Sequence, residues 1–257
     1  MDIFRNTVLV AVIVGLLAGL AMALMQSFST VPLILQAETF EAAEPAPAPA
    51  APATTHDSSA AAPAQDHSAA AGGGQEHESA AWAPADGFER IAYTVAANFL
   101  AGIGFALLLV VVSELAGGIL SWRQGVLWGL AGFAVFTLAP GLGLPPNMPA
   151  MPAAELGVRQ LWWWFAAVGA AAGLWLIVFH GSGVWSLVGV ALIVAPHIVG
   201  APQPVSYESA VPEGLHRQFI VMSTVTNLVF WVLLGGLVGL VRNRFLSSET
   251  ALEGRLA

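Results

Sequence analysis

The composition of the chain is defined first by what it lacks. The 257 residues include no cysteine and no lysine, and charged residues make up only 9% of them, against about 25% in an ordinary soluble domain. Without cysteine there can be no disulfides, thiolate metal sites, iron–sulfur clusters or cysteine nucleophiles. With eight arginines against 16 acids, the chain also lacks the basic face that a nucleic-acid binder needs. Because 57% of the residues are apolar, we predict an all-α polytopic membrane protein embedded in the lipid bilayer.

Six apolar segments are candidates for crossing the membrane, since a bilayer core of about 30 Å needs roughly 20 apolar helical residues. We predict six transmembrane helices, at 7–28, 91–112, 123–139, 161–179, 182–199 and 219–241. The fifth is the weakest, because Pro196 interrupts it near its end. With both termini cytoplasmic, five of the eight arginines lie inside, as the positive-inside rule favours.

Glycine spacing indicates how these helices pack. Four of the predicted spans carry glycines four residues apart: Gly15/Gly19, Gly125/Gly129, Gly169/Gly173 and Gly235/Gly239. Small residues at this spacing let helix backbones approach closely in lipid. We therefore interpret these pairs as packing interfaces and not as the lining of a pore.

An acidic residue precedes an arginine by four positions wherever the chain re-enters the membrane from outside. The pairs are Asp86/Arg90, Glu155/Arg159 and Glu213/Arg217. This spacing places both side chains on one helix face, with the acid in the favoured first turn. One interpretation is a helix start anchored at the interface. The other is a bundle of three outward-facing helical hairpins, built from successive spans, whose charged pairs ring a common vestibule.

The composition divides the chain into four regions. Residues 1–41 form the first span and its outer exit, 42–86 an external loop, 87–242 a five-helix membrane bundle and 243–257 a cytoplasmic tail. The loop holds 18 alanines, six prolines and six acids but no basic residue. Such a segment cannot build a packed core, so we expect it to be disordered.

Three of the six histidines fall in this loop, each beside a carboxylate. The residues concerned are His56, Asp57, Asp66, His67, Glu76, His77 and Glu78. Imidazole and carboxylate groups together bind borderline divalent cations, so the loop is a candidate for capturing metal ions outside the cell. The alternative is a solvated spacer in which the histidines are incidental.

Four further residues near the outer surface are candidate metal ligands: Glu38, Glu41, His197 and His216. His197 follows Pro196, which frees a backbone carbonyl, and broken helix ends at membrane depth usually line a cavity. The spans themselves hold few polar residues, namely Thr94, Asn98, Thr224, Thr226 and Asn227, with no acid or histidine near mid-membrane. A helper subunit or a homo-oligomer would therefore complete an ion path.

Several ordered stretches are similar to those of a known family. They are 30–38 with Glu41, 87–90, 129–133 continuing to 138–146, 159–163, the Pro-His-Ile-Val-Gly-Ala-Pro run at 196–202, and Thr226-Asn227 with Phe230-Trp231. Together they resemble the CbtA family, a proposed cobalt transporter subunit. The resemblance covers nearly the whole chain except the loop.

The resemblance implies a multi-pass protein of the bacterial inner membrane that imports cobalt for corrinoid synthesis. It implies Co²⁺ as the transported ion, no bound cofactor, and a small single-span, histidine-bearing partner of the CbtB type. His197 with Glu38 and Glu41 would form the entrance site. Nickel is a second candidate for the ion, and a metal-responsive scaffold or sensor that transports nothing is the alternative function. No nucleotide loop, zincin helix or serine elbow is present in the sequence, so we expect neither an enzyme nor a built-in ATPase.

Overall fold

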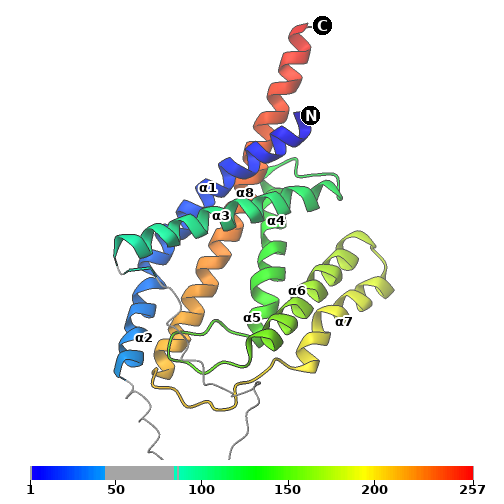
Figure 1. The fold of residues 1–257 in the computed structure, drawn as a ribbon. Coiled ribbons are helices and arrows are strands. Elements are labelled where there is room, and N and C mark those ends of the chain that lie inside the picture. The colour runs from blue at the N-terminus through cyan, green and yellow to red at the C-terminus, as the bar shows by residue number, and fades with distance from the viewer. Residues whose placement is uncertain (1, 44–83, 86, 257) are drawn as a thin grey trace, which may run out of the picture.

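The computed structural model describes residues 2–43, 84–85 and 87–256 (Figure 1). All regular elements within these ranges are helical, which confirms the predicted all-α class. They are α1 (Asp2–Phe28), α2 (Val31–Ala43), α3 (Phe88–Glu114), α4 (Trp122–Phe133), the π-helical turn η1 (Ala134–Leu138), α5 (Ala139–Gly143), α6 (Leu156–Phe179), α7 (Gly183–Val199) and α8 (Glu213–Leu256). Nearly all of the external loop predicted at 42–86 lies outside the described residues.

Five helical stretches among the described residues are long and apolar enough to cross a membrane. They are Arg5–Phe28, Phe88–Glu114, Trp122–Gly143, Leu156–Phe179 and Glu213–Arg244. By length and composition, these helices are consistent with the predicted polytopic membrane protein. The remaining predicted span corresponds to α7, an apolar helix of 17 residues, so a sixth crossing stays a prediction.

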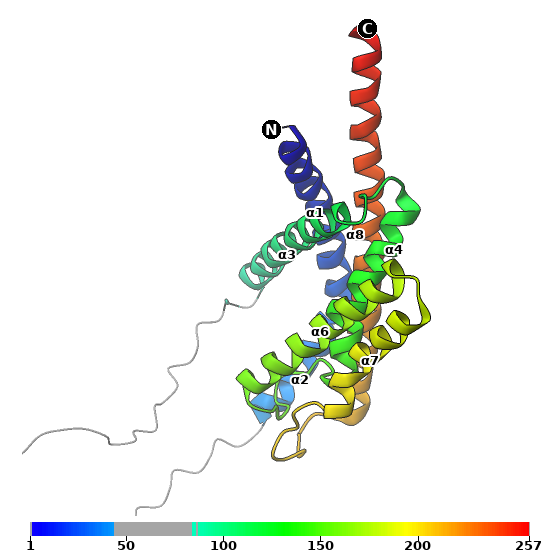
Figure 2. The same cartoon turned by 90° about the vertical axis from the view of Figure 1, so that its right-hand side faces the viewer.

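Three antiparallel helix pairs make up the bundle: α1 with α3, α4 with α8, and α6 with α7. The α4–α8 pair lies between the other two, as the two views in Figures 1 and 2 show. Our prediction paired successive spans, and it is correct for the first pair alone. The third span packs against the last, and the fourth against the fifth, because their glycine-containing faces meet in that arrangement.

Glycines bring the paired backbones into contact. A Cβ atom added to Gly125 in α4 would lie 2.1 Å from the carbonyl oxygen of Gly235 in α8. One added to Gly102 in α3 would lie 2.4 Å from the oxygen of Gly15 in α1. In the third pair, a Cβ on Gly173 would lie 2.4 Å from the oxygen of Gly189. These contacts confirm that the glycine pairs serve helix packing.

Aromatic side chains fill the space where α3, η1 and α8 meet. Phe136 stacks on Trp231 with ring centres 5.7 Å apart and planes 6° from parallel. Phe105 packs against both of these rings from α3. Gly132 makes room for Trp231, since a Cβ there would lie 2.2 Å from the indole ring. This cluster joins the central pair of helices to α3.

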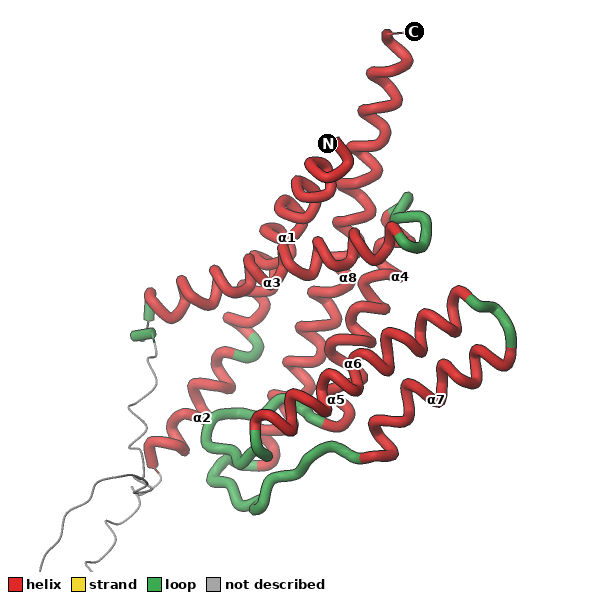
Figure 3. The backbone as a smooth tube through the Cα atoms, turned by 45° about the vertical axis from the view of Figure 1, so that its right-hand side comes forward, coloured by secondary structure: helices red, strands yellow, loops and turns green. Residues whose placement is uncertain are grey.

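The 144–155 and 200–212 loops, both predicted to lie outside, gather at one end of the bundle, as Figure 3 shows. Leu33 of α2, Met148 of the 144–155 loop and Val211 of the 200–212 loop share one buried apolar cluster. At the other end, Arg242 of α8 forms an ion pair with Glu114, the last residue of α3. Both chain ends lie toward that second end (Figure 1). Which end of the bundle faces the cytoplasm, and how many helices cross the membrane, stay predictions.

Candidate functional site

The predicted metal ligands of the external loop cannot be placed. His56, Asp57, Asp66, His67, Glu76, His77 and Glu78 all lie outside the described residues. Within the described residues, no group of three or more His, Asp or Glu side chains is close enough together to hold a metal ion. The metal-binding role of these residues stays a prediction.

Glu38 lies on α2, an element that the sequence analysis did not foresee, and its carboxylate binds Arg90. Arg90 Nη1 donates to Glu38 Oε2 at 3.1 Å, and Nη2 contacts Oε1. Each side chain is about one-third exposed. The pair ties α2 to the first turn of α3, and the guanidinium neutralises the carboxylate. Glu41 is an exposed residue one turn further along α2.

His197 lies in the last turn of α7, where Trp162 of α6 supports it. The two rings meet edge to face with their centres 5.7 Å apart. The indole Nε1 of Trp162 donates to the carbonyl oxygen of Pro196 at 3.2 Å. His197 therefore lies beside an aromatic ring, and it does not form a metal-binding group with Glu38 and Glu41.

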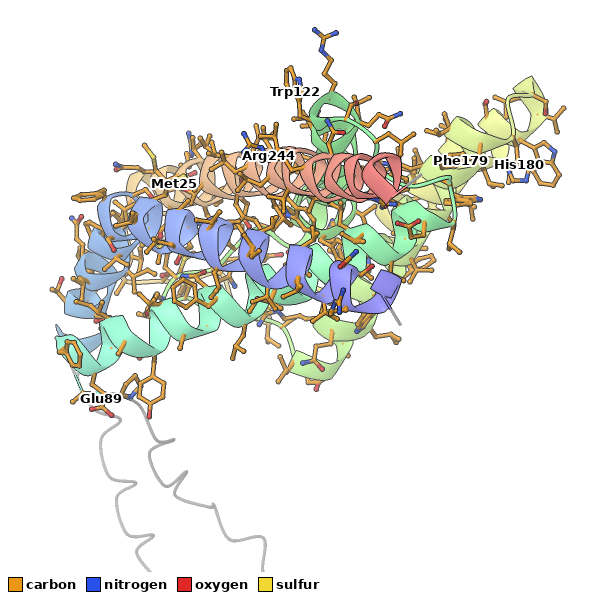
Figure 4. The ribbon with its side chains drawn as sticks, turned by 90° about the horizontal axis from the view of Figure 1, so that it is seen from above. Met25, Glu89, Trp122, Phe179, His180 and Arg244 are labelled. Atoms are coloured by element: carbon orange, nitrogen blue, oxygen red, sulfur yellow. The ribbon has the colours of Figure 1, made fainter. Side chains whose placement is uncertain are left out.

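His216, in the first turn of α8, is bound to the 144–155 loop. Its Nε2 lies 3.2 Å from the carbonyl oxygen of Pro146. Because a carbonyl oxygen can only accept, Nε2 carries the proton, which leaves Nδ1 as the nitrogen able to bind a metal. His180 lies at the tip of the α6–α7 hairpin, far from Glu89 at the start of α3 (Figure 4). His197 and His216 lie on different helices, α7 and α8, and neither belongs to a group of three or more side chains that could hold a metal ion.

The structure describes two of the three acid–arginine pairs, because Asp86 lies outside the described residues, so the ring of charged pairs stays a prediction. Glu213 and Arg217 do pair, and both are largely exposed. Glu155 instead accepts hydrogen bonds from the backbone N–H groups of Gly157 and Val158, at 2.8 and 3.0 Å. These two bonds hold the pKa of the Glu155 carboxyl below its usual range. The first backbone N–H groups of a helix have no partner within the helix. The Glu155 carboxylate accepts hydrogen bonds from two of them and so caps the start of α6.

A polar cavity lies where α1, α2 and α8 meet. Its volume is about 140 Å³, room for several water molecules. Its lining residues come from the end of α1, the start of α2 and the first half of α8: Met22, Gln26, Thr30, Ile34, Phe219, Ser223, Thr226 and Asn227. Five of the eight lining residues have uncharged side chains that carry oxygen, although more of the exposed lining surface is apolar than polar.

Hydrogen bonds order the side chains around this cavity. Asn98 of α3 donates through Nδ2 to Gln26 Oε1 at 2.7 Å. The hydroxyls of Ser29 and Thr226 lie 3.1 Å apart, which links α1 to α8. Asn227 Nδ2 donates to the backbone oxygen of Ser223 at 2.9 Å. These hydrogen bonds fix the positions of the polar side chains where α1, α3 and α8 meet.

The sequence analysis named Thr226 and Asn227 as polar residues within a span but missed the cavity. A periodic pattern was available: Met22, Gln26 and Thr30 recur every four residues, and Ser223 and Asn227 share that spacing. Such spacing places each set on one helix face. The sequence does not reveal that these two faces meet, because α1 and α8 lie at opposite ends of the chain.

Comparison with known families matches nearly the whole chain. Residues 4–243 match the family described as probable cobalt transporter subunit (CbtA). No curated protein and no solved structure matches the chain. The matched region includes the helix pairs, the polar cavity and the stretches on which the resemblance was based. Together with its membrane-spanning helices, this match shows that the chain belongs to the CbtA family of probable cobalt transporter subunits.

Proposed function

We propose that this chain is the membrane-embedded subunit of an importer that carries Co²⁺, or Ni²⁺, across the bacterial inner membrane. The observation that carries the proposal is the family match over residues 4–243, in a chain with five helices long enough to span a bilayer. A family of transporter subunits points to a non-enzymatic role. Cobalt delivered in this way would serve corrinoid synthesis.

In this proposal, both termini are cytoplasmic and six helices cross the membrane. The histidine and carboxylate residues of the 42–86 loop collect ions outside, with Glu38, Glu41, His197 and His216 near the mouth. A small single-span, histidine-bearing subunit of the CbtB type, or a second copy of this chain, supplies ligands that the bundle lacks. The dispersion of His, Asp and Glu over the described residues supports the need for such a partner.

Uptake of labelled cobalt tests the proposal. Cells without their own cobalt transporters would express the chain alone and together with a CbtB-type partner. We expect uptake at least several-fold above background with the partner, and a marked loss in His197→Ala. His180→Ala, at the tip of the α6–α7 hairpin, is the matched control and should keep its uptake. Correct membrane insertion without uptake in either setting would contradict transport.

The alternative is a metal-responsive scaffold that binds ions outside without moving them. Among the described residues, no three His, Asp or Glu side chains lie close enough together to bind an ion within the bundle, which favours the scaffold. The purified full-length protein would then bind cobalt, and binding would change its association with a partner, while the cells accumulate no cobalt. Metal-dependent association without accumulation would identify the scaffold.

A further inference from the structure

The α6–α7 hairpin has little packing against the rest of the bundle. Of the 17 residues of α7, only Gly189 and Pro196 are buried, and both of them face α6. α6 packs against η1 and α5 as well as α7, but the backbones of both helices have at most marginal contact with α1, α3 and α8. Because few buried contacts attach the hairpin, moving it as a unit costs little free energy.

The end of the hairpin that joins the two flanking loops is held in place. Met148, in the loop before α6, and Val211, in the loop after α7, belong to one buried apolar cluster. The Ser209 hydroxyl donates to the carbonyl oxygen of Ala150 at 3.3 Å, which ties the two loops to each other. His197 lies at this end, in the last turn of α7. We call it the pinned end of the hairpin.

The opposite end, the tip at residues 175–187, is attached to another helix by aromatic rings. Phe179 lies against Trp128 of α4, with the ring centres 6.4 Å apart, and against Trp175 of its own helix at 4.3 Å. The described residues include no hydrogen bond or ion pair between the tip and another helix. Figure 3 shows the tip to one side of the α4–α8 pair. A ring contact of this kind can part without leaving a polar group unsatisfied.

The central helix changes its winding where the hairpin is attached. The Ala139 N–H donates to the carbonyl oxygen of Ala134, five residues earlier, so η1 is wound more widely than an α-helix. Pro140 follows and has no N–H group, so it cannot continue the ordinary hydrogen-bond pattern. Ala167 of α6 packs directly on this turn. Wide turns and prolines are the usual causes of bends in helices.

We propose that the α6–α7 hairpin is a hinged gate of the transporter. It turns as a rigid body about η1 and the pinned end, and its tip separates from α4. The close backbone contact between Gly173 and Gly189 keeps the hairpin itself rigid. The gate therefore opens at the end of the bundle where both chain ends lie, opposite His197. Hinge motion of one packed unit against another is a common route to alternating access. The inference rests on the proposed function, since it concerns the release of the same ion.

Distances between paired spin labels test the movement without a transport assay. Because the chain has no cysteine, labels attach only to engineered thiols. Leu127 on α4, Val184 at the start of α7 and Leu9 on α1 are all exposed. In lipid nanodiscs, we expect Leu127→Cys with Val184→Cys to give a distance distribution at least twice as broad as Leu127→Cys with Leu9→Cys. The second pair is the matched control, because α4 and α1 both pack against α8. Equally narrow distributions would overturn the inference.

A reversible cross-link tests whether transport needs this movement. Trp128→Cys with Phe179→Cys, joined by a reducible thiol cross-linker, holds the tip on α4. We expect the initial rate of cobalt uptake to fall at least tenfold and to recover on reduction. His180→Cys with Trp185→Cys is the matched control, since these rings lie 5.5 Å apart but both belong to the hairpin. Cross-linking this pair should leave uptake within about twofold of the parent.

The outcomes separate the gate from the proposed function. Unchanged uptake after complete cross-linking of the Trp128→Cys/Phe179→Cys variant would overturn the gate and leave the proposed function intact. If that variant fails to insert, equally narrow spin-label distributions overturn the gate, because those labels replace exposed residues alone. No uptake by the parent would overturn the proposed function and, with it, the gate.

Discussion

At the scale of single residues, Glu155 makes the stability of α6 depend on pH. Its carboxylate accepts two backbone N–H bonds, which lower its pKa in the folded protein. Because the pKa of this carboxyl is lower in the folded protein than in the unfolded chain, the carboxylate stabilises the fold fully at a pH above the unfolded pKa of about 4.3. This stabilisation is lost as the pH falls through the lower pKa of the folded protein. We therefore expect Glu155→Ala to lower the melting temperature at neutral pH, with a difference from the parent that shrinks below about pH 4.3.

Thermal unfolding of the purified protein in detergent, measured from pH 7 to pH 3, provides the test. Glu208→Ala removes an exposed acid from the 200–212 loop and controls for the change of charge. Its melting temperature should follow that of the parent over the whole range. A difference between the parent and Glu155→Ala that stays constant from pH 7 to pH 3 would show that the carboxylate does not act as a cap.

At the scale of helices, the close contact between α1 and α3 depends on Gly102. Gly104, two residues later in the same helix, provides a matched control. A Cβ at Gly102 would lie 2.4 Å from the Gly15 carbonyl oxygen, whereas one at Gly104 meets nothing within 4 Å. Overpacking of this kind typically costs about 1–3 kcal/mol, because backbone cannot move aside as a flexible side chain can. We expect Gly102→Ala to lower the melting temperature clearly and Gly104→Ala to leave it unchanged or raise it. Equal melting temperatures would argue against the close α1–α3 approach.

The helices could be located from the sequence, whereas their partners could not. Apolar runs define the spans because the bilayer sets their length, and each predicted span overlaps a helix in the structure. Pairing depends on which glycine faces meet, and several spans carry equivalent Gly-x-x-x-Gly spacing. The sequence therefore could not indicate that Gly125 contacts Gly235 and not the glycines of the next span.

The candidate site could not be located from the sequence for the same reason, because it depends on which distant segments meet. Charged and histidine residues are conspicuous in an apolar sequence, but the described ones act locally: Glu38 binds Arg90, Glu155 caps α6 and His216 holds a loop. The polar cavity depends on uncharged residues that look unremarkable singly. It arises where α1 breaks near Pro32 and α8 passes beside it, a juxtaposition of distant segments.

At the scale of the whole molecule, the apolar cluster of Leu33, Met148 and Val211 bears on the number of crossings. Met148 precedes the α6–α7 hairpin and Val211 follows it, so the hairpin leaves this end of the bundle and returns to it. α6 covers about 36 Å and α7 about 26 Å at 1.5 Å per residue. α7 is shorter than the five candidate spans, so a sixth crossing would need the 200–212 loop to cover the remaining distance.

Because the chain has no cysteine, single engineered thiols can test this topology directly. Gly183, at the start of α7, and Val205, in the following loop, are both exposed, and a Cβ at Gly183 meets nothing within 4 Å. If α7 crosses the membrane, a membrane-impermeant maleimide added to intact cells labels Val205→Cys, and labels Gly183→Cys only after permeabilisation. Labelling of both positions from the same side would mean that α7 does not cross. The protein would then have five spans, with Arg242 and Arg244 outside, against the positive-inside rule.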